Sequence, residues 1–177
     1  VGVLFSISSL ANTAWIFAWH YDYIAISAVL TSVILICLAL ISVTLRNANL
    51  VGRQRWLIGL RFSVYFGWAT VATVANITVL LVKYKWDGFG LAPSTWAVII
   101  VLVAMAIGTV TMLRNRDAAY GLVLIWAFGG ILLRQISSGG LDGRYPQIIT
   151  AVVASLVIFV IGEVLVLRSR KSGQVPA

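Results

Sequence analysis

Polar and aromatic side chains recur at helical spacing inside two strongly apolar stretches of this chain. The first set of residues is Ser8, Asn12, Trp15 and Trp19. The second set is Tyr65, Trp68, Ala72 and Asn76. Residues at these intervals share one face of an α-helix. Because an unpaired polar group in hydrocarbon costs several kcal/mol, each stripe must face a neighbouring helix or a pocket.

If the two stripes face each other, they enclose a site lined with indole, phenol and carboxamide groups. Such a lining suits a large, flat, mostly apolar ligand that carries a few polar groups. We therefore predict these ligand-binding residues: Asn12, Trp15, Trp19, Tyr65, Trp68, Ala72 and Asn76. The alternative is that the two asparagines form hydrogen bonds between helices and that the tryptophans only pack.

Few other residues offer reactive groups. The single histidine, His20, is a weak candidate for an axial ligand to the metal of a tetrapyrrole, and a wet histidine at the membrane interface is the simpler explanation. Glu163 lies well inside an apolar stretch, and we expect it to reach the interface or to pair with the basic C-terminal residues. The sequence contains no metal-ligand cluster, phosphate-binding loop, nucleophile elbow or paired-carboxylate spacing. We therefore predict no metal site, no catalytic residue and no enzymatic activity.

The composition is that of an integral membrane protein. Of the 177 residues, 61% are hydrophobic and 10% are charged, whereas about 25% are charged in a typical soluble domain. The net charge of +8 does not indicate nucleic-acid binding, because the 13 Lys and Arg residues cluster in short gaps between apolar stretches. The single cysteine, Cys37, excludes an intramolecular disulfide. The predicted fold class is an all-α, polytopic membrane helix bundle.

Six apolar stretches each approach the roughly 20 residues that cross a bilayer. The predicted spans are residues 1–19, 24–45, 60–82, 94–113, 118–136 and 146–167. Asp117 directly precedes the fifth span and is placed to cap its helix. We interpret residues 1–168 as one transmembrane helical domain and residues 169–177 as a polar tail.

The positive charges lie mostly on one side of the predicted bundle. The loop at 46–61, the hairpin at 114–116 and the C-terminal tail carry nine Lys and Arg residues, and the opposite side carries four. The more basic side is normally cytoplasmic, so both ends of this chain, including the tail, are predicted to be cytoplasmic. Trp56, Trp86 and Trp96 lie at span ends, where we expect them to anchor the chain at the membrane interface.

Two segments resemble a known family, the TspO/MBR proteins, also called tryptophan-rich sensory or translocator proteins. Residues 63–76, SVYFGWATVATVAN, resemble the family's fifth-helix motif, approximately Pro-Tyr-x-x-Trp-x-x-x-Ala-x-x-x-Asn, with Val64 in place of the proline. Residues 9–15, SLANTAW, are similar to its third-helix pattern Leu-x-Asn-x-x-Trp. The span between them then corresponds to the fourth helix. The resemblance is closest to the longer bacterial branch, in which extra C-terminal helices follow the TspO-like core.

The resemblance implies a multi-pass protein of the bacterial inner (cytoplasmic) membrane that acts in sensing or transport. The implied ligands are tetrapyrroles such as porphyrin and haem, and other flat apolar molecules such as carotenoids and sterols. No cofactor is implied as required, and family members often form homodimers. The family's first two helices, with their Trp-Pro and Phe-x-x-x-Trp elements, have no counterpart here. We expect them to be absent from the protein or to lie outside this sequence.

A different class of function remains open. The chain can instead be an accessory structural subunit of a larger membrane complex, for example a pigment-binding photosynthetic or respiratory assembly. In that role it would hold carotenoid, (bacterio)chlorophyll or membrane lipid at its surface. A small-solute transporter is the last choice, because such proteins place ionisable or helix-breaking residues in the middle of their spans.

Overall fold

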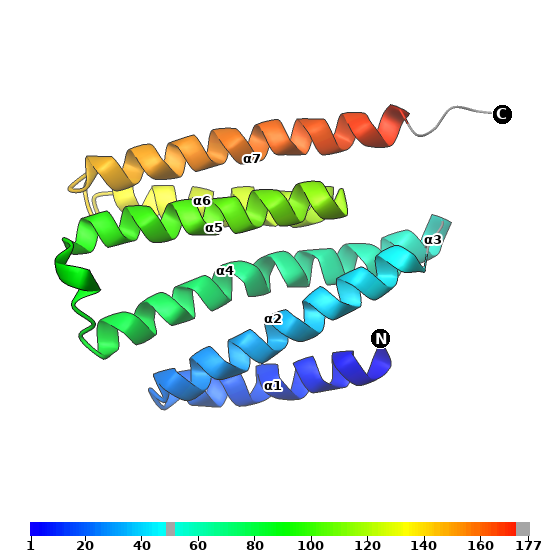
Figure 1. The fold of residues 1–177 in the computed structure, drawn as a ribbon, viewed down its shortest axis with the longest axis horizontal. Coiled ribbons are helices and arrows are strands. Elements are labelled where there is room, and N and C mark those ends of the chain that lie inside the picture. The colour runs from blue at the N-terminus through cyan, green and yellow to red at the C-terminus, as the bar shows by residue number, and fades with distance from the viewer. Residues whose placement is uncertain (49–51, 173–177) are drawn as a thin grey trace. The chain divides into compact units, whose positions relative to one another are not determined.

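The computed structural model describes residues 1–48 and 52–172, and this part of the chain is helical throughout, with short turns. The elements, in order, are α1 (Gly2–His20), α2 (Ile24–Asn47), α3 (Gly52–Gln54), a π-helical turn (Arg55–Gly59), α4 (Leu60–Lys83), a 3-10 turn (Gly88–Gly90), α5 (Pro93–Asn115), α6 (Ala118–Ile136) and α7 (Pro146–Ser172) (Figure 1). Six helices in these residues are long and apolar enough to cross a membrane. The all-α class and the predicted number of membrane-spanning helices are therefore confirmed.

The last helix is longer than its predicted span. α7 continues to Ser172, although the apolar run that predicted it ends at residue 167. Hydropathy marks where a helix leaves hydrocarbon, whereas polar residues such as Arg and Ser do not themselves stop a helix. The first four residues of the predicted tail are thus helical, and residues 173–177 lie outside the described part of the chain.

Local signals define several helix ends. Asp117 caps α6 as predicted, because its carboxylate accepts a hydrogen bond from the Tyr120 backbone N–H at 3.2 Å. Pro93 and Pro146 each stand at the first position of their helix, where a missing N–H leaves no intrahelical bond unmade. α5 ends at Asn115, and the next residue, Arg116, adopts the left-handed conformation with φ of 49°.

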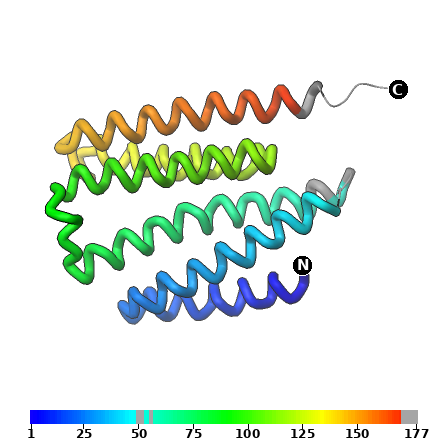
Figure 2. The backbone as a smooth tube through the Cα atoms, in the orientation of Figure 1, coloured from blue at the N-terminus to red at the C-terminus, as the bar shows by residue number. Residues whose placement is uncertain are grey.

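Contacts divide the chain into two compact units, and the first comprises Val1–Trp86. In this unit α2 packs against both α1 and α4, and Figure 2 follows the backbone through these helices. The α2 residues Ile34, Leu38 and Ile41 are buried, which makes α2 the central helix of the unit. At one end, the Lys83 ammonium of α4 forms an ion pair with Asp22 and also donates to the Asp22 carbonyl, so the α1–α2 turn is tied to the end of α4.

The second unit comprises Asp87–Ala177, and in its described part α7 packs against α5 and α6. Its core contains Val152 and Phe159 of α7 together with Leu124 and Phe128 of α6. The Phe128 and Phe159 rings meet edge to face with centroids 4.9 Å apart. Gly108 of α5 permits this packing, because a Cβ there would overlap the Leu124 side chain.

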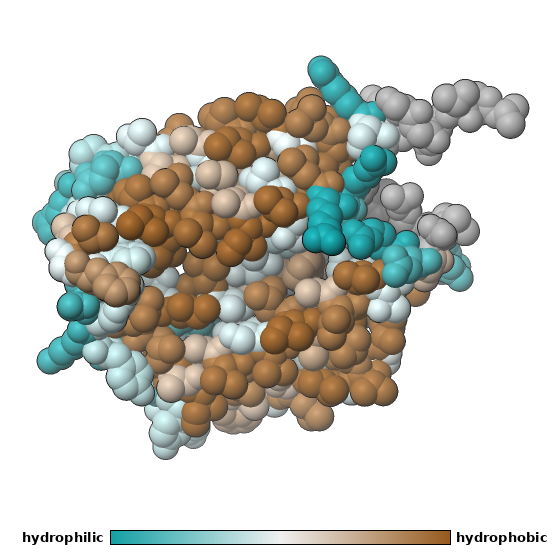
Figure 3. All heavy atoms as spheres, in the orientation of Figure 1, coloured by the Kyte–Doolittle hydropathy of each residue, from teal (hydrophilic) through white to brown (hydrophobic). Residues whose placement is uncertain are grey.

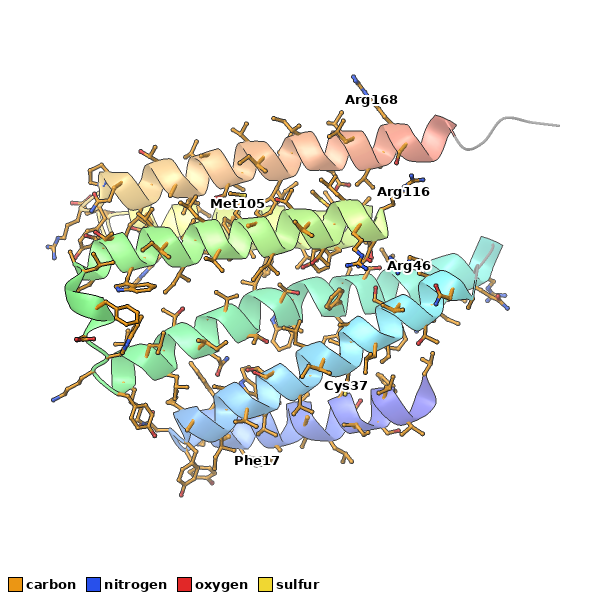
Figure 4. All side chains as sticks on the ribbon, in the orientation of Figure 1. Phe17, Cys37, Arg46, Met105, Arg116 and Arg168 are labelled. Carbon is orange, nitrogen blue, oxygen red and sulfur yellow. The ribbon has the colours of Figure 1, made fainter. Side chains whose placement is uncertain are left out.

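Side chains on the outside of the helices follow the membrane pattern. Figure 3 shows hydrophobic residues along the helices and hydrophilic residues gathered near helix ends. Phe17 extends outward from α1 and is 58% exposed (Figure 4). Arg46, Arg116 and Arg168 lie near the ends of α2, α5 and α7.

Candidate ligand-binding site

The structure brings three of the seven predicted site residues into one aromatic cluster. The indole of Trp15 on α1 meets that of Trp68 on α4 edge to face, with ring centroids 5.7 Å apart and planes at 81°. The Tyr65 ring stacks on Trp68 at 5.9 Å and 27°. All three side chains are half-buried. We call Trp15, Tyr65 and Trp68 the aromatic cluster.

Two further candidates, Trp19 and His20, lie at the end of α1. The Trp19 ring is 6.3 Å from that of Trp15, and Trp19 is 43% exposed. His20 is exposed at the end of α1, with its ring 5.1 Å from that of Tyr21. The described residues contain no group of three or more side chains that could hold a metal ion.

Two buried polar atoms on α1, one of them within the cluster, lack hydrogen bonds in the described part of the chain. Among the described residues, neither the Asn12 side-chain oxygen nor the Trp15 indole nitrogen has a hydrogen-bond partner. The oxygen can accept a hydrogen bond and the indole N–H can donate one. The two residues are three positions apart on α1, so they share one helix face. Leaving both groups unpaired in a membrane is costly, and a ligand with its own donor and acceptor would satisfy them.

Asn76 lies elsewhere in the unit and has partners within it. Its side-chain oxygen accepts a hydrogen bond from the Ser27 hydroxyl of α2, and its amide group donates to the Ala72 carbonyl at 3.1 Å. The side chain is only 4% exposed. Asn76 therefore joins α2 to α4, as the alternative interpretation of the asparagines proposed. Ala72 is half-buried and contributes its carbonyl to this contact.

A row of hydroxyl groups extends the contact between α2 and α4. The Thr73 hydroxyl donates to the Ala69 carbonyl of its own helix at 2.8 Å and shares its hydrogen with the Thr31 carbonyl of α2 at 3.2 Å. Thr31, Thr73 and Ser27 are all buried. Ser27 and Thr31 are not among the residues predicted from the sequence. Their signal is present, since they are two small polar residues four positions apart in an otherwise apolar helix. Ser8, from the first stripe, is also buried, and its hydroxyl donates to the Phe5 carbonyl of its own helix.

Glu163 belongs to the second unit and is enclosed there. Its side chain is 7% exposed, so it does not extend freely to the interface. The carboxylate lies against Gly121 of α6, beside the sulfur of Met112 on α5. Any Cβ at residue 121 would overlap both groups. Glu163 is thus a packed member of the α5–α7 unit and has no part in the aromatic cluster.

Comparison with known proteins identifies the family. No curated protein and no solved structure matches the chain. The family model of the TSPO-like proteins matches residues 1–165, which include most of both units. This match confirms the resemblance inferred from residues 9–15 and 63–76. The chain therefore belongs to the TSPO-like protein family and is a multi-pass membrane protein of the TspO type.

Proposed function

We propose that this protein binds a flat, mostly apolar ligand such as a tetrapyrrole at the aromatic cluster, and that it acts in sensing or transport. The observation that carries the proposal is that the Asn12 side-chain oxygen and the Trp15 indole nitrogen are buried without a hydrogen-bond partner in the described part of the chain, while the Trp15 ring meets that of Trp68. The rings would stack on the face or edge of the ligand. The two polar atoms would fix its orientation through one accepted and one donated hydrogen bond.

The proposed role is binding, with no cofactor required. Porphyrin, haem, carotenoid and sterol-like molecules all have the flat apolar body that the cluster suits, and the Asn12–Trp15 pair favours those that carry a polar group. Ala72 and Asn76 would act indirectly, by holding α4 against α2. Trp19 would border the ligand from the edge of the cluster.

The first experiment measures porphyrin binding to the full chain in lipid nanodiscs. Protoporphyrin IX would be titrated while tryptophan fluorescence and porphyrin absorption are recorded. Trp68→Leu should weaken binding about tenfold, because it removes an aromatic contact worth about 1 kcal/mol or more. Asn12→Ala should weaken it by a similar factor, because it removes one hydrogen bond to a buried group.

The matched control is Trp126→Leu. Trp126 is also a mid-span tryptophan, but it lies on α6 in the second unit and is 74% exposed. Its replacement should leave porphyrin affinity unchanged. Equal affinities for the wild type, Trp68→Leu and Asn12→Ala would show that the aromatic cluster is not the binding site.

A second candidate function is favoured by the exposed aromatic residue itself. Trp126 presents most of its indole outward from the middle of α6, which suits contact with a pigment or with a helix of another subunit. In this role the protein would be an accessory subunit of a pigment-binding photosynthetic or respiratory complex. Purification from native membranes in mild detergent would test it. Co-purifying subunits and bound (bacterio)chlorophyll or carotenoid would support it, whereas a free monomer or homodimer that binds added porphyrin would support the first function.

A further inference from the structure

The turn between α4 and α5 has an uncommon backbone. Three consecutive residues, Gly88, Phe89 and Gly90, have φ values of 62°, 54° and 75°. Glycine adopts these left-handed angles readily, but a bulky residue such as phenylalanine rarely does. The position of Phe89 is therefore imposed by the contacts around it.

Side chains on both sides of Phe89 impose this conformation. The Asp87 carboxylate accepts a hydrogen bond from the Phe89 backbone N–H at 3.1 Å. The Trp96 indole N–H donates to the Gly88 carbonyl. Only glycine fits at residue 88, because a Cβ there would overlap the Trp96 indole. The turn thus packs on the Trp96 indole, whose N–H is hydrogen-bonded within the protein.

The turn presents the Phe89 side chain outward. Phe89 is 80% exposed, more than any other large hydrophobic residue in the described chain. Its ring centroid lies 6.3 Å from that of Trp96, with the planes 38° apart. Trp96 belongs to the first turn of α5, which begins at Pro93 and is long and apolar enough to span the membrane. The Phe89 ring therefore lies beside the part of α5 that enters the bilayer.

We propose that Phe89 is a lipid anchor that inserts into the interfacial layer of the bilayer, next to the start of α5. The turn joins two spanning helices, so it must lie at the membrane surface. Aromatic rings favour the region between headgroups and acyl chains. Leu91, which is 45% exposed, adds apolar surface beside the ring. The left-handed backbone of Phe89 directs its ring toward the lipid. The inserted ring holds the start of α5 at a constant depth in the membrane.

Spin labelling in lipid nanodiscs tests this insertion. A nitroxide would be attached to Phe89→Cys in a Cys37→Ser background, and its collisions with oxygen and with a water-soluble nickel chelate would be compared. The control is Asp142→Cys in the α6–α7 loop. Asp142 is also exposed and left-handed, with φ of 48°. We expect the oxygen-to-nickel accessibility ratio to be several-fold higher at residue 89 than at residue 142.

The other outcomes overturn the proposal. A ratio at residue 89 equal to that at residue 142 would place the side chain in water. Exclusion of both reagents would show that protein, a partner or a second copy, covers it. Photolabelling of the wild type with a diazirine phospholipid needs no substitution, and it should leave adducts on Phe89. Phe89→Gly relieves the backbone and removes the ring, so adducts on residues 88–91 should fall several-fold. No adducts on wild-type Phe89 would exclude lipid contact.

Discussion

At the scale of single residues, two asparagines with similar positions in their sequence stripes, Asn12 and Asn76, differ in whether their side chains have hydrogen-bond partners. Asn76 is bonded to Ser27 and to its own helix, and it contributes to packing. Asn12 has a buried oxygen with no hydrogen-bond partner among the described residues. Natural proteins tolerate such groups where function requires them, and they lose stability as a result. The contrast supports our proposal that Asn12, rather than Asn76, contacts the ligand.

The first prediction follows from the unbonded Asn12. Asn12→Leu should raise the free energy of unfolding of the ligand-free protein by about 1 kcal/mol, because it removes an unsatisfied buried group. The same variant should lose the thermal stabilisation that porphyrin gives to the wild type. Thermal unfolding with and without porphyrin measures both effects. A less stable ligand-free variant would show that Asn12 already has a stabilising role inside the protein.

The second prediction concerns the bond between α2 and α4. Ser27→Ala removes the hydroxyl that donates to Asn76, and it should lower the free energy of unfolding by about 0.6–1 kcal/mol. Porphyrin affinity should stay close to that of the wild type, since Ser27 bonds to Asn76, and the remaining Asn76–Ala72 bond and the packing of α2 on α4 preserve the indirect role of Asn76. Thr13→Ala is the control, because the exposed Thr13 hydroxyl bonds only within α1. Weaker porphyrin binding by Ser27→Ala would instead place this polar contact in the binding site.

At the scale of elements, hydropathy identified the six spans because each must cover the hydrocarbon layer by itself. The helical spacing of the two stripes also allowed the inference that Trp15 and Trp68 face each other. Other features cannot be inferred from the spacing of residues along one helix, because they depend on contacts between separate elements. The bond between Ser27 and Asn76 depends on how α2 is rotated against α4. The left-handed Phe89 depends on Trp96, whose indole holds the preceding residue from the next helix.

The third prediction tests close packing between α6 and its neighbours. Gly121→Ala should lower the free energy of unfolding by about 1–3 kcal/mol, because the added methyl group would overlap the Glu163 carboxylate and Met112. Gly129→Ala on the same helix meets no atom within 4 Å. It should be neutral or stabilise by up to about 1 kcal/mol, since alanine is the better helix former. Denaturant unfolding of both variants in one detergent gives the comparison, and equal effects would contradict the packing.

At the scale of the whole molecule, charge is distributed very unevenly along the chain. The segments 46–61, 114–116 and 168–171 hold nine of the 13 basic residues. Because two spanning helices lie between each of these segments and the next, all three must emerge on the same side of the membrane. Anionic lipids of the cytoplasmic leaflet attract such a surface. We therefore propose that both ends of this chain face the cytoplasm of a bacterial cell.

The fourth prediction tests this orientation in intact cells. In a Cys37→Ser background, Asp142→Cys should react with an impermeant maleimide added outside. Asn115→Cys, at the end of α5, should react only after the membrane is permeabilised. Labelling in the reverse order would invert the proposed topology. Labelling of both residues from one side would contradict the six-span topology itself.

The aromatic cluster also has an optical consequence. Trp15 and Trp68 lie 5.7 Å apart and nearly perpendicular, close enough for the electronic transitions of their indoles to couple. Coupled indoles in a fixed chiral arrangement give a pair of bands of opposite sign in far-ultraviolet circular dichroism, and a single tryptophan does not produce such a couplet. The intensity of that couplet depends on the distance and angle between α1 and α4. A change in the intensity of this couplet would therefore report a change in the distance or angle between α1 and α4, without any added label.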